Sequence, residues 1–313
     1  MTPPAPSSNG PDRPPGAAKP KVIYIMGSGR CGSTILGVSL GNCEGMFFVG
    51  ELDRWLPSDG RPVLGGTERT RFWAGVHEQV EVDPALIGGR TRDAFERAGG
   101  VLSPEQHRFR RRYGESYRRT TERLYEAIAR QAGATHIVES SHFPMRAEQL
   151  KRMEGLELYL IFLVRHPQSV MASFTRNVNK SDRAAVRRRI LTTNLDLWAT
   201  HLLAMRTFLG HPAERRLFMR YEDLTADPRA VLRQVLAMTG SQAELPDLEH
   251  LSTGFPMGGN RLLRDEVVAF KPEASAPPHA DPVTAALQTP AEAMFKKLRP
   301  AAVAPARGTA VPG

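Results

Sequence analysis

This sequence has only two cysteines and lacks both a secretion signal and apolar runs of membrane-spanning length. Cys31 and Cys43 are the only cysteines among 313 residues, which excludes a disulfide framework, and neither has metal-ligand spacing around it. The stretch after Met1 lacks the apolar core of a signal peptide, and no later run approaches the ~20 apolar residues that span a bilayer. We therefore expect a soluble, cytoplasmic protein with no membrane span and no metal site.

Positive charge is in excess. Lys and Arg number 42 against 33 Asp and Glu, a net charge of +9, which favours an anionic partner. Two arginine-rich stretches, His107 to Arg119 and Arg183 to Arg189, fall in helical patterns without the interleaved aromatic residues that stack on bases. We interpret them as solvated helix faces, the alternative for the second being attraction of an acidic ligand, and we do not expect nucleic acid as a partner. The oligomeric state is left open.

The chain divides by composition into three parts. Residues 1–20 are rich in Pro and Gly and lack hydrophobic periodicity, so we expect a disordered N-terminal segment. Residues 21–271 are expected to form one catalytic domain around a single core. Residues 272–313 form an Ala/Pro-rich tail that we expect to be largely disordered, with one weak helical patch around Ala291 to Leu298.

Short apolar runs alternate with longer helical patterns inside the domain. Such alternation predicts an α/β fold, with a P-loop-like parallel sheet flanked by helices and ligands at the carboxyl ends of the strands. The predicted buried strands are Val22 to Met26, Phe47 to Gly50, His136 to Glu139, Leu158 to Val164 and Leu217 to Arg220.

A glycine-rich loop follows the first predicted strand. Residues 27–34 read Gly-Ser-Gly-Arg-Cys-Gly-Ser-Thr and lead into a helix. Glycines allow close backbone approach to an anion, and the helix amino terminus offers free N–H groups. The spacing resembles a Walker A loop, but no lysine follows Gly32, and Arg30 supplies the cation earlier. Alone, this loop fits any phosphate ligand or an ordinary strand-to-helix turn.

A second candidate anion site follows the strand that ends at Val164. Arg165 stands at the strand end, Pro167 occupies the first turn of a helix, and Ser173 lies further along it. An arginine fork and a hydroxyl suit a phosphate group. The alternative is an arginine that pairs with a structural carboxylate.

These two segments, in this order and separation, resemble the 5′-phosphosulfate loop and the 3′-phosphate motif of the sulfotransferase superfamily. Arg220-Tyr221-Glu222-Asp223-Leu224 is similar to a strand-ending segment of that family, and Gly258-Gly259-Asn260-Arg261 resembles a late segment that closes over the nucleotide. The resemblance covers roughly residues 21–265. It is closest to the bacterial carbohydrate and tyrosylprotein types.

The resemblance implies 3′-phosphoadenosine 5′-phosphosulfate (PAPS) as the donor, with no metal. Tyr221 and Arg261 are the weaker assignments, since the first can simply pack and the second can be a solvated cation. The residues implied in donor binding are Ser28, Gly29, Arg30, Cys31, Gly32, Ser33, Thr34, Arg165, Ser173, Tyr221 and Arg261.

Three residues are candidates for the chemistry. The resemblance implies Glu51, which ends the second predicted strand, as the general base, and Arg30 as the cation beside the leaving phosphate. His142 stands where related bacterial enzymes resemble D-S-S-K and carry lysine, so it shares or replaces the role of Glu51, or only caps a helix.

The predicted function is transfer of a sulfonate group from PAPS to an acceptor hydroxyl, with release of adenosine 3′,5′-bisphosphate (PAP). A small-molecule or glycan acceptor is expected, whether carbohydrate, lipid or secondary metabolite, and Trp55, Phe72 and Trp73 are candidate wall residues that can equally just pack. The alternatives are a P-loop kinase-like phosphotransferase and a non-catalytic nucleotide-binding protein.

Overall fold

A five-stranded parallel sheet forms the centre of the molecule. The computed structural model describes residues 18–101, 103–175, 182–271 and 282–298. The strand order is β2-β3-β1-β4-β5, and every pairing in this sheet is parallel. This confirms the predicted α/β class. The strands are β1 (Lys21–Gly27), β2 (Met46–Gly50), β3 (His136–His142), β4 (Glu157–Val164) and β5 (Arg216–Arg220).

Strand β1 shows why these runs form central strands. Successive side chains of a strand point to opposite faces, so an apolar run needs cover on both sides. Val22, Tyr24 and Met26 join one core cluster, while Ile23 and Ile25 join the other. Strand β3 runs three residues past the predicted end at Glu139, because Ser141 finds a buried hydrogen-bond partner in place of water.

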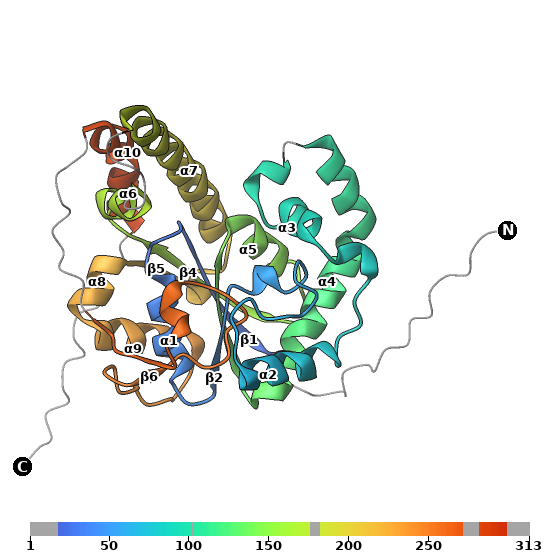
Figure 1. The fold of residues 1–313 in the computed structure, drawn as a ribbon. Helices are drawn as coiled ribbons and strands as arrows, with labels where there is room; N and C mark the ends of the chain where they lie inside the picture. Colours follow the sequence, from blue (N-terminus) through green and yellow to red (C-terminus); the bar gives the residue numbers. More distant parts are fainter. Residues whose placement is uncertain (1–17, 102, 176–181, 272–281, 299–313) are drawn as a thin grey trace, which may run out of the picture.

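Helices cover both faces of the sheet. On one face α4, α5 and α7 contact β1, β3 and β4, and on the other α1, α8 and α9 contact the sheet (Figure 1). The helices are α1 (Ser33–Gly41), α2 (Thr67–His77), α3 (Gly89–Phe95), α4 (Pro104–Ala132), α5 (Pro144–Leu150), α6 (Pro167–Thr175), α7 (Arg183–Leu209), α8 (Tyr221–Ala226), α9 (Pro228–Thr239) and α10 (Pro282–Leu298).

Shorter elements complete the described chain. They include a two-stranded antiparallel pair, β6 (Leu251–Ser252) and β7 (Val267–Val268). Five 3₁₀ helices connect the larger elements: η1 (Leu52–Arg54), η2 (Pro84–Leu86), η3 (Ala98–Val101), η4 (Ala213–Arg215) and η5 (Arg261–Arg264). In the described ranges, no helix is long and apolar enough to cross a bilayer.

The register brings the carboxyl ends of the strands together at one edge. Gly27 pairs with Leu163 and Val164 pairs with Arg220, so the ends of β1, β4 and β5 are level. On the other side, Met26 pairs with His142. Every motif identified in the sequence on a strand end therefore opens onto the same edge of the sheet.

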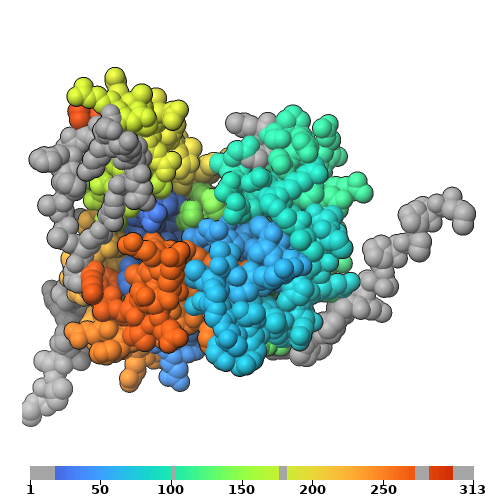
Figure 2. Space-filling model, viewed as in Figure 1, coloured from blue at the N-terminus to red at the C-terminus, as the bar shows by residue number. Residues whose placement is uncertain are grey.

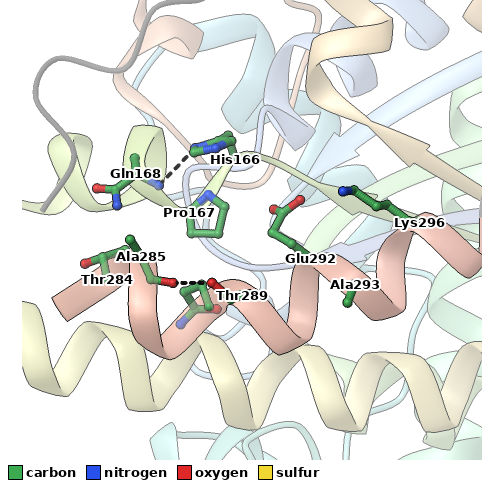
Figure 3. Close-up of a pocket in the computed structure, with 10 residues that line it drawn as sticks. His166, Pro167, Gln168, Thr284, Ala285, Thr289, Glu292, Ala293 and Lys296 are labelled. Carbon is green, nitrogen blue, oxygen red and sulfur yellow. Dashed lines mark hydrogen bonds between the residues drawn. The ribbon is translucent and has the colours of Figure 1, made fainter. Parts of the chain in front are cut away.

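Helix α10 lies in the segment expected to be a largely disordered tail. It is longer than the predicted helical patch and packs against α6 and α7, burying Ala291 and Phe295 completely. A cavity of about 400 Å³ separates it from the start of α6, and Figure 3 shows Glu292 and Lys296 projecting from α10 towards the segment of His166 and Pro167. Residues 1–17, 272–281 and 299–313 of the predicted disordered segments lie outside the described residues.

Candidate active site

The glycine-rich loop after β1 is tightly constrained by its neighbours. A Cβ on Gly27 would lie 2.2 Å from the carbonyl oxygen of Leu163, so only glycine fits there. Gly32 begins α1 in the left-handed region at φ 98°, a conformation that favours glycine. It gives α1 no side-chain cap, and no acidic residue stands in the first turn. The first-turn N–H groups are thus free of a competing carboxylate, as an anion site requires.

Polar groups in this loop fit an anion. The Ser28 side chain is buried, and its Oγ has no hydrogen-bond partner among the described residues, a cost that a bound acceptor oxygen would remove. Arg30 is exposed and adopts φ 68°, which is strained for a non-glycine residue. Cys31 points into the core, where burial raises the pKa of its thiol to about 11, so only its backbone can face a ligand.

Tyr221 connects the loop to the second anion motif. Its ring covers Gly32 so closely that a Cβ there would lie 2.2 Å from Tyr221 Cδ2. The Arg165 guanidinium carbon lies 4.6 Å from the centre of the same ring, and Arg165 Nη1 donates to the carbonyl oxygen of Arg30 at 3.3 Å. The structure therefore brings together three of the segments that the sequence analysis singled out.

Ser173 and Arg261, the other candidates for donor binding outside the loop, lie on separate elements. Ser173 is half-buried on α6, the helix that begins two residues after Arg165. Arg261 is exposed on η5, and within the described residues no hydrogen bond or ion pair joins it to the loop. Its segment instead runs beside β2, where Glu51 N donates to the carbonyl oxygen of Gly258 at 2.9 Å.

Glu51 follows β2 at the same sheet edge. Its carboxylate is 20% exposed and accepts from Arg54 Nε at 2.6 Å, so it is ion-paired yet open to solvent. The charge of Glu51 opposes the effect of burial on Arg54 and leaves the pKa of that guanidinium raised. Gly50, just before it, approaches Gly258 so closely that a Cβ would lie 2.2 Å from the carbonyl oxygen.

His142 ends β3 and lies within electrostatic reach of Glu51. Burial lowers the pKa of His142 from its ordinary 6.5, and the negative charges of Glu51 and Asp196 only partly oppose this. The imidazole is therefore neutral at neutral pH and can accept a proton. Its backbone adopts φ 59°, another strained position at this edge.

A buried ionic network supports this edge from below. Arg146 Nε donates to Glu139 at 2.5 Å and Arg146 Nη1 to Glu96 at 2.5 Å, and all three side chains are almost fully buried. Tyr125 and Ser141 also donate to Glu139, and Ser141 Oγ accepts from Asp53 N at 3.1 Å. The network thus fixes the turn directly after Glu51.

Burial raises the pKa of two carboxyl groups, that of Glu96 within this network and that of Asp53 beside it. Burial raises the pKa of Glu96 to about 7 and that of Asp53 to about 6, and the charge of Arg146 opposes both shifts. Both groups therefore titrate closer to neutral pH than an exposed carboxyl group does.

A cavity of about 340 Å³ lies beside the loop. Figure 2 shows the surface hollowed between the yellow-green residues of α7 and the teal residues around position 97, with blue atoms deeper in. Gly29 and His142 line it from the sheet edge, and the remaining lining residues are Glu96, Arg97, Ala98, Gly99, Phe143, Pro144, Asp196, Thr200 and Leu203.

Of the two interpretations of Trp55, Phe72 and Trp73, packing in the core is the one that the structure confirms. Trp55, Phe72 and Trp73 are buried in the core cluster, and none of them lines the cavity. Besides Gly29 and His142, the lining residues come from the segment directly after α3, the start of α5 and the middle of α7. Glu96, His142 and Asp196 lie about fifty residues apart in sequence and carry no shared motif, so only the folded chain identifies them.

The arrangement suits transfer of a group between an anionic donor and a second ligand in the cavity. Hydrogen-bond donors suited to an anion lie at the loop. Two groups that can accept a proton, Glu51 and His142, lie at the neighbouring strand ends. Within the described ranges no cluster of side chains is suited to hold a metal ion.

Solved structures similar to this chain share low sequence identity with it. The sulfotransferase domain from the Synechococcus PCC 7002 olefin synthase is 21% identical, with TM-score 0.49 over 90% of this chain and 97% of that chain. The sulfotransferase domain from the curacin biosynthetic pathway is 20% identical, with TM-score 0.44 over 81% and 85%. A sulfotransferase from Alicyclobacillus acidocaldarius is 16% identical, with TM-score 0.41 over 90% and 93%.

The family comparison covers most of the domain. No curated protein matches the chain. The model of the sulfotransferase family matches residues 20–244, from the start of β1 to beyond α9. That span contains the loop, Glu51, His142, Arg165 and Tyr221. The chain therefore belongs to the sulfotransferase family and is a sulfotransferase.

Proposed function

We propose that this enzyme transfers the sulfonate group of PAPS to a hydroxyl group of an acceptor bound in the cavity beside Gly29. The observation that carries the proposal is the joining of two anion motifs through Tyr221, whose ring contacts both Gly32 and Arg165. PAPS carries phosphates at both ends of its ribose, and a single-phosphate ligand would use only one of these motifs. A soluble nucleotide donor also fits the excess of positive charge.

Each residue then has a defined task. The backbone N–H groups of residues 28–34, with the hydroxyls of Ser33 and Thr34, hold the 5′-phosphosulfate, and Arg165 with Ser173 holds the 3′-phosphate. Arg30 neutralises the oxygen that leaves with the phosphate. The weaker assignments, Tyr221 and Arg261, orient the nucleotide.

The transfer exchanges one sulfur–oxygen bond for another. The acceptor oxygen forms a bond to sulfur while the bond from sulfur to the 5′-phosphate oxygen breaks, and PAP leaves with both electrons of that bond. The acceptor proton passes to Glu51, or to the neutral imidazole of His142. Gly29 is shared by the loop and the cavity wall, which supports direct transfer between the two ligands.

The alternatives have less support. A kinase-like phosphotransferase needs a cation that reaches the transferred phosphate, and the loop has no lysine at the Walker position. A non-catalytic nucleotide-binding protein is compatible with histidine at position 142, but Glu51 keeps a partly open carboxylate at the same edge.

Two measurements test the proposal. Calorimetric titration should show PAP binding at least about ten times more tightly than ATP, since only PAP presents a 3′-phosphate. Incubation with ³⁵S-labelled PAPS and a panel of alcohols should then transfer label to at least one of them. Tighter binding of ATP would favour the kinase-like alternative, and PAP binding without transfer to any acceptor would favour the non-catalytic one.

A further inference from the structure

The cavity beside Gly29 contains a carboxylate with no partner. Asp196 is exposed on α7 and lines the cavity, and among the described residues it has no hydrogen bond or ion pair through its side chain. Its negative charge nevertheless reaches His142, where it raises the pKa of the imidazole against the effect of burial. The Asp196 carboxylate therefore lies near the expected reaction centre and is uncompensated.

A second carboxylate oxygen at the same cavity is also unsatisfied. Glu96 is 2% exposed, and its Oε1 accepts from Arg146 and from Tyr117, at 2.5 and 2.8 Å. Its Oε2 has no hydrogen-bond partner in the part of the chain that the structure describes. A buried carboxylate oxygen left without a donor is costly, so a ligand that donates to it gains affinity.

Arg97, the arginine that lines the cavity, already has partners. Arg97 Nη1 lies 3.5 Å from Asp93 Oδ1, and its guanidinium carbon lies 5.9 Å from the centre of the Phe143 ring. The remaining titratable lining residue, His142, is neutral at neutral pH because burial lowers its pKa. The groups that lack a partner at this cavity are thus hydrogen-bond acceptors, and the unpaired charge is negative.

We propose that the acceptor is an alcohol that carries an ammonium group, with the ammonium bound by Asp196 and Glu96 and the hydroxyl presented towards Gly29 and His142. This proposal rests on the proposed function. An ammonium group supplies the missing charge and up to three N–H donors, which matches the unpaired charge of Asp196 and the unsatisfied Oε2 of Glu96. A neutral alcohol would leave Asp196 uncompensated, and a carboxylated one would be repelled.

Matched acceptors of one shape test the proposal. We suggest trans-4-aminocyclohexanol, trans-4-methylcyclohexanol and trans-4-hydroxycyclohexanecarboxylate, each titrated by calorimetry into the full chain saturated with PAP at pH 7. The amino alcohol should bind about ten-fold more tightly than the methyl analogue, because a charge-assisted hydrogen bond replaces an apolar contact, and the carboxylate should bind more weakly than both. With labelled PAPS, the label should appear on the hydroxyl oxygen of the amino alcohol.

Two variants test whether Asp196 causes the preference for the amino alcohol. Asp196→Asn should reduce the preference for the amino alcohol to about two-fold or less, because it removes the charge and keeps the shape. Glu44→Gln removes one negative charge at an exposed site on another part of the chain and should leave the ten-fold preference in place.

The outcomes separate this proposal from the proposed function. Equal or tighter binding of the methyl or carboxylate analogue overturns the ammonium assignment, and so does a preference that survives in Asp196→Asn. If PAP itself fails to bind, the proposed function is wrong. The same three-ligand comparison without PAP then still decides whether the cavity selects an ammonium group.

Discussion

Arg220 and Glu292 form an ion pair, with 3.2 Å between Nη1 and Oε2, that ties the last described helix to the end of β5. The pair continues inward, because Arg220 Nε also lies 3.4 Å from Glu222, and Glu222 Oε1 accepts from His166 N at 2.8 Å. His166 directly follows Arg165. Helix α10, beyond the family match, thus helps to fix the backbone beside the predicted 3′-phosphate site.

Breaking this pair should weaken donor binding without unfolding the protein. We expect Glu292→Gln to raise the Kd for PAP about three-fold, since a partly exposed ion pair contributes at most about 1 kcal/mol. Glu292→Asp should restore part of the affinity. Lys297→Gln, on the exposed side of the same helix, is the matched control. Unchanged PAP affinity in Glu292→Gln would show that α10 only covers the core.

Arg165→Ala tests the 3′-phosphate assignment. Loss of a phosphate-bound guanidinium should raise the Kd for PAP about ten- to hundred-fold. The Kd for AMP, which lacks the 3′-phosphate, should change far less, so the ratio of the two constants should collapse. Arg233→Ala removes an equal charge from an exposed site on α9 and should preserve the ratio. A ratio unchanged by Arg165→Ala would move the 3′-phosphate elsewhere.

Gly32→Ala should damage the loop through two separate effects. The new Cβ would meet Tyr221 at 2.2 Å, and the backbone at φ 98° is unfavourable for alanine, so together we expect about 2–4 kcal/mol of destabilisation. The double variant Gly32→Ala/Tyr221→Ala should recover only the steric part. Urea denaturation of both variants and of Tyr221→Ala measures the coupling. Additive effects would contradict the contact.

Glu51→Gln tests the general base. A lost base typically lowers turnover about 10²- to 10⁴-fold, and the Kd for PAP should stay within about two-fold. His142→Gln should lower turnover by less than ten-fold if Glu51 is the base. The reverse order would assign proton transfer to His142. In that case wild-type turnover would fall as His142 becomes protonated. This would happen at a pH below 6.5, because burial lowers the pKa of the imidazole.

His201 should make the fold sensitive to acid. Burial lowers its pKa to about 4, and neither ring nitrogen has a hydrogen-bond partner among the described residues. Between pH 6.5 and 4 the unfolded chain binds a proton that the folded chain does not, so the free energy of unfolding falls as pH falls, by up to roughly 3 kcal/mol.

Substitution of His201 should remove its contribution to the fall in the free energy of unfolding at low pH. The free energy of unfolding of His201→Phe, from urea denaturation at pH 7.5 and 4.5, should fall less than that of the wild type. Phe162 and Phe295, which flank the imidazole, can pack against the new ring. His107→Gln, at an exposed position, should behave as the wild type. Equal acid sensitivity in His201→Phe would show that other groups control it.

The sequence predicted the strands well because each is an unbroken apolar run buried on both faces. The exception is instructive: β3 continues through Ser140 and Ser141, whose polarity ends the apolar pattern although a buried network satisfies Ser141. Helix α10 was also underestimated, because Pro290 lies inside it and only its second half shows helical periodicity.

Local motifs identified the glycine-rich loop as a candidate anion site, whereas the cavity depends on long-range packing. The loop candidates from Ser28 to Thr34 are adjacent in sequence, so spacing alone groups them. Glu96 follows α3 and Asp196 lies on α7, and no local pattern distinguishes them from ordinary surface carboxylates. Their common feature, a carboxylate oxygen at one cavity without a hydrogen-bond partner among the described residues, exists only in the folded chain.

The position of β1 has a consequence for biosynthesis. It is the first strand of the described residues and the middle strand of the sheet, and both of its neighbours, β3 and β4, are translated more than a hundred residues later. Contacts so distant in sequence form slowly. The glycine-rich loop therefore leaves the ribosome early but acquires its partners at Leu163 and Tyr221 late, and the ability to bind a nucleotide should mark the final stage of maturation of the chain.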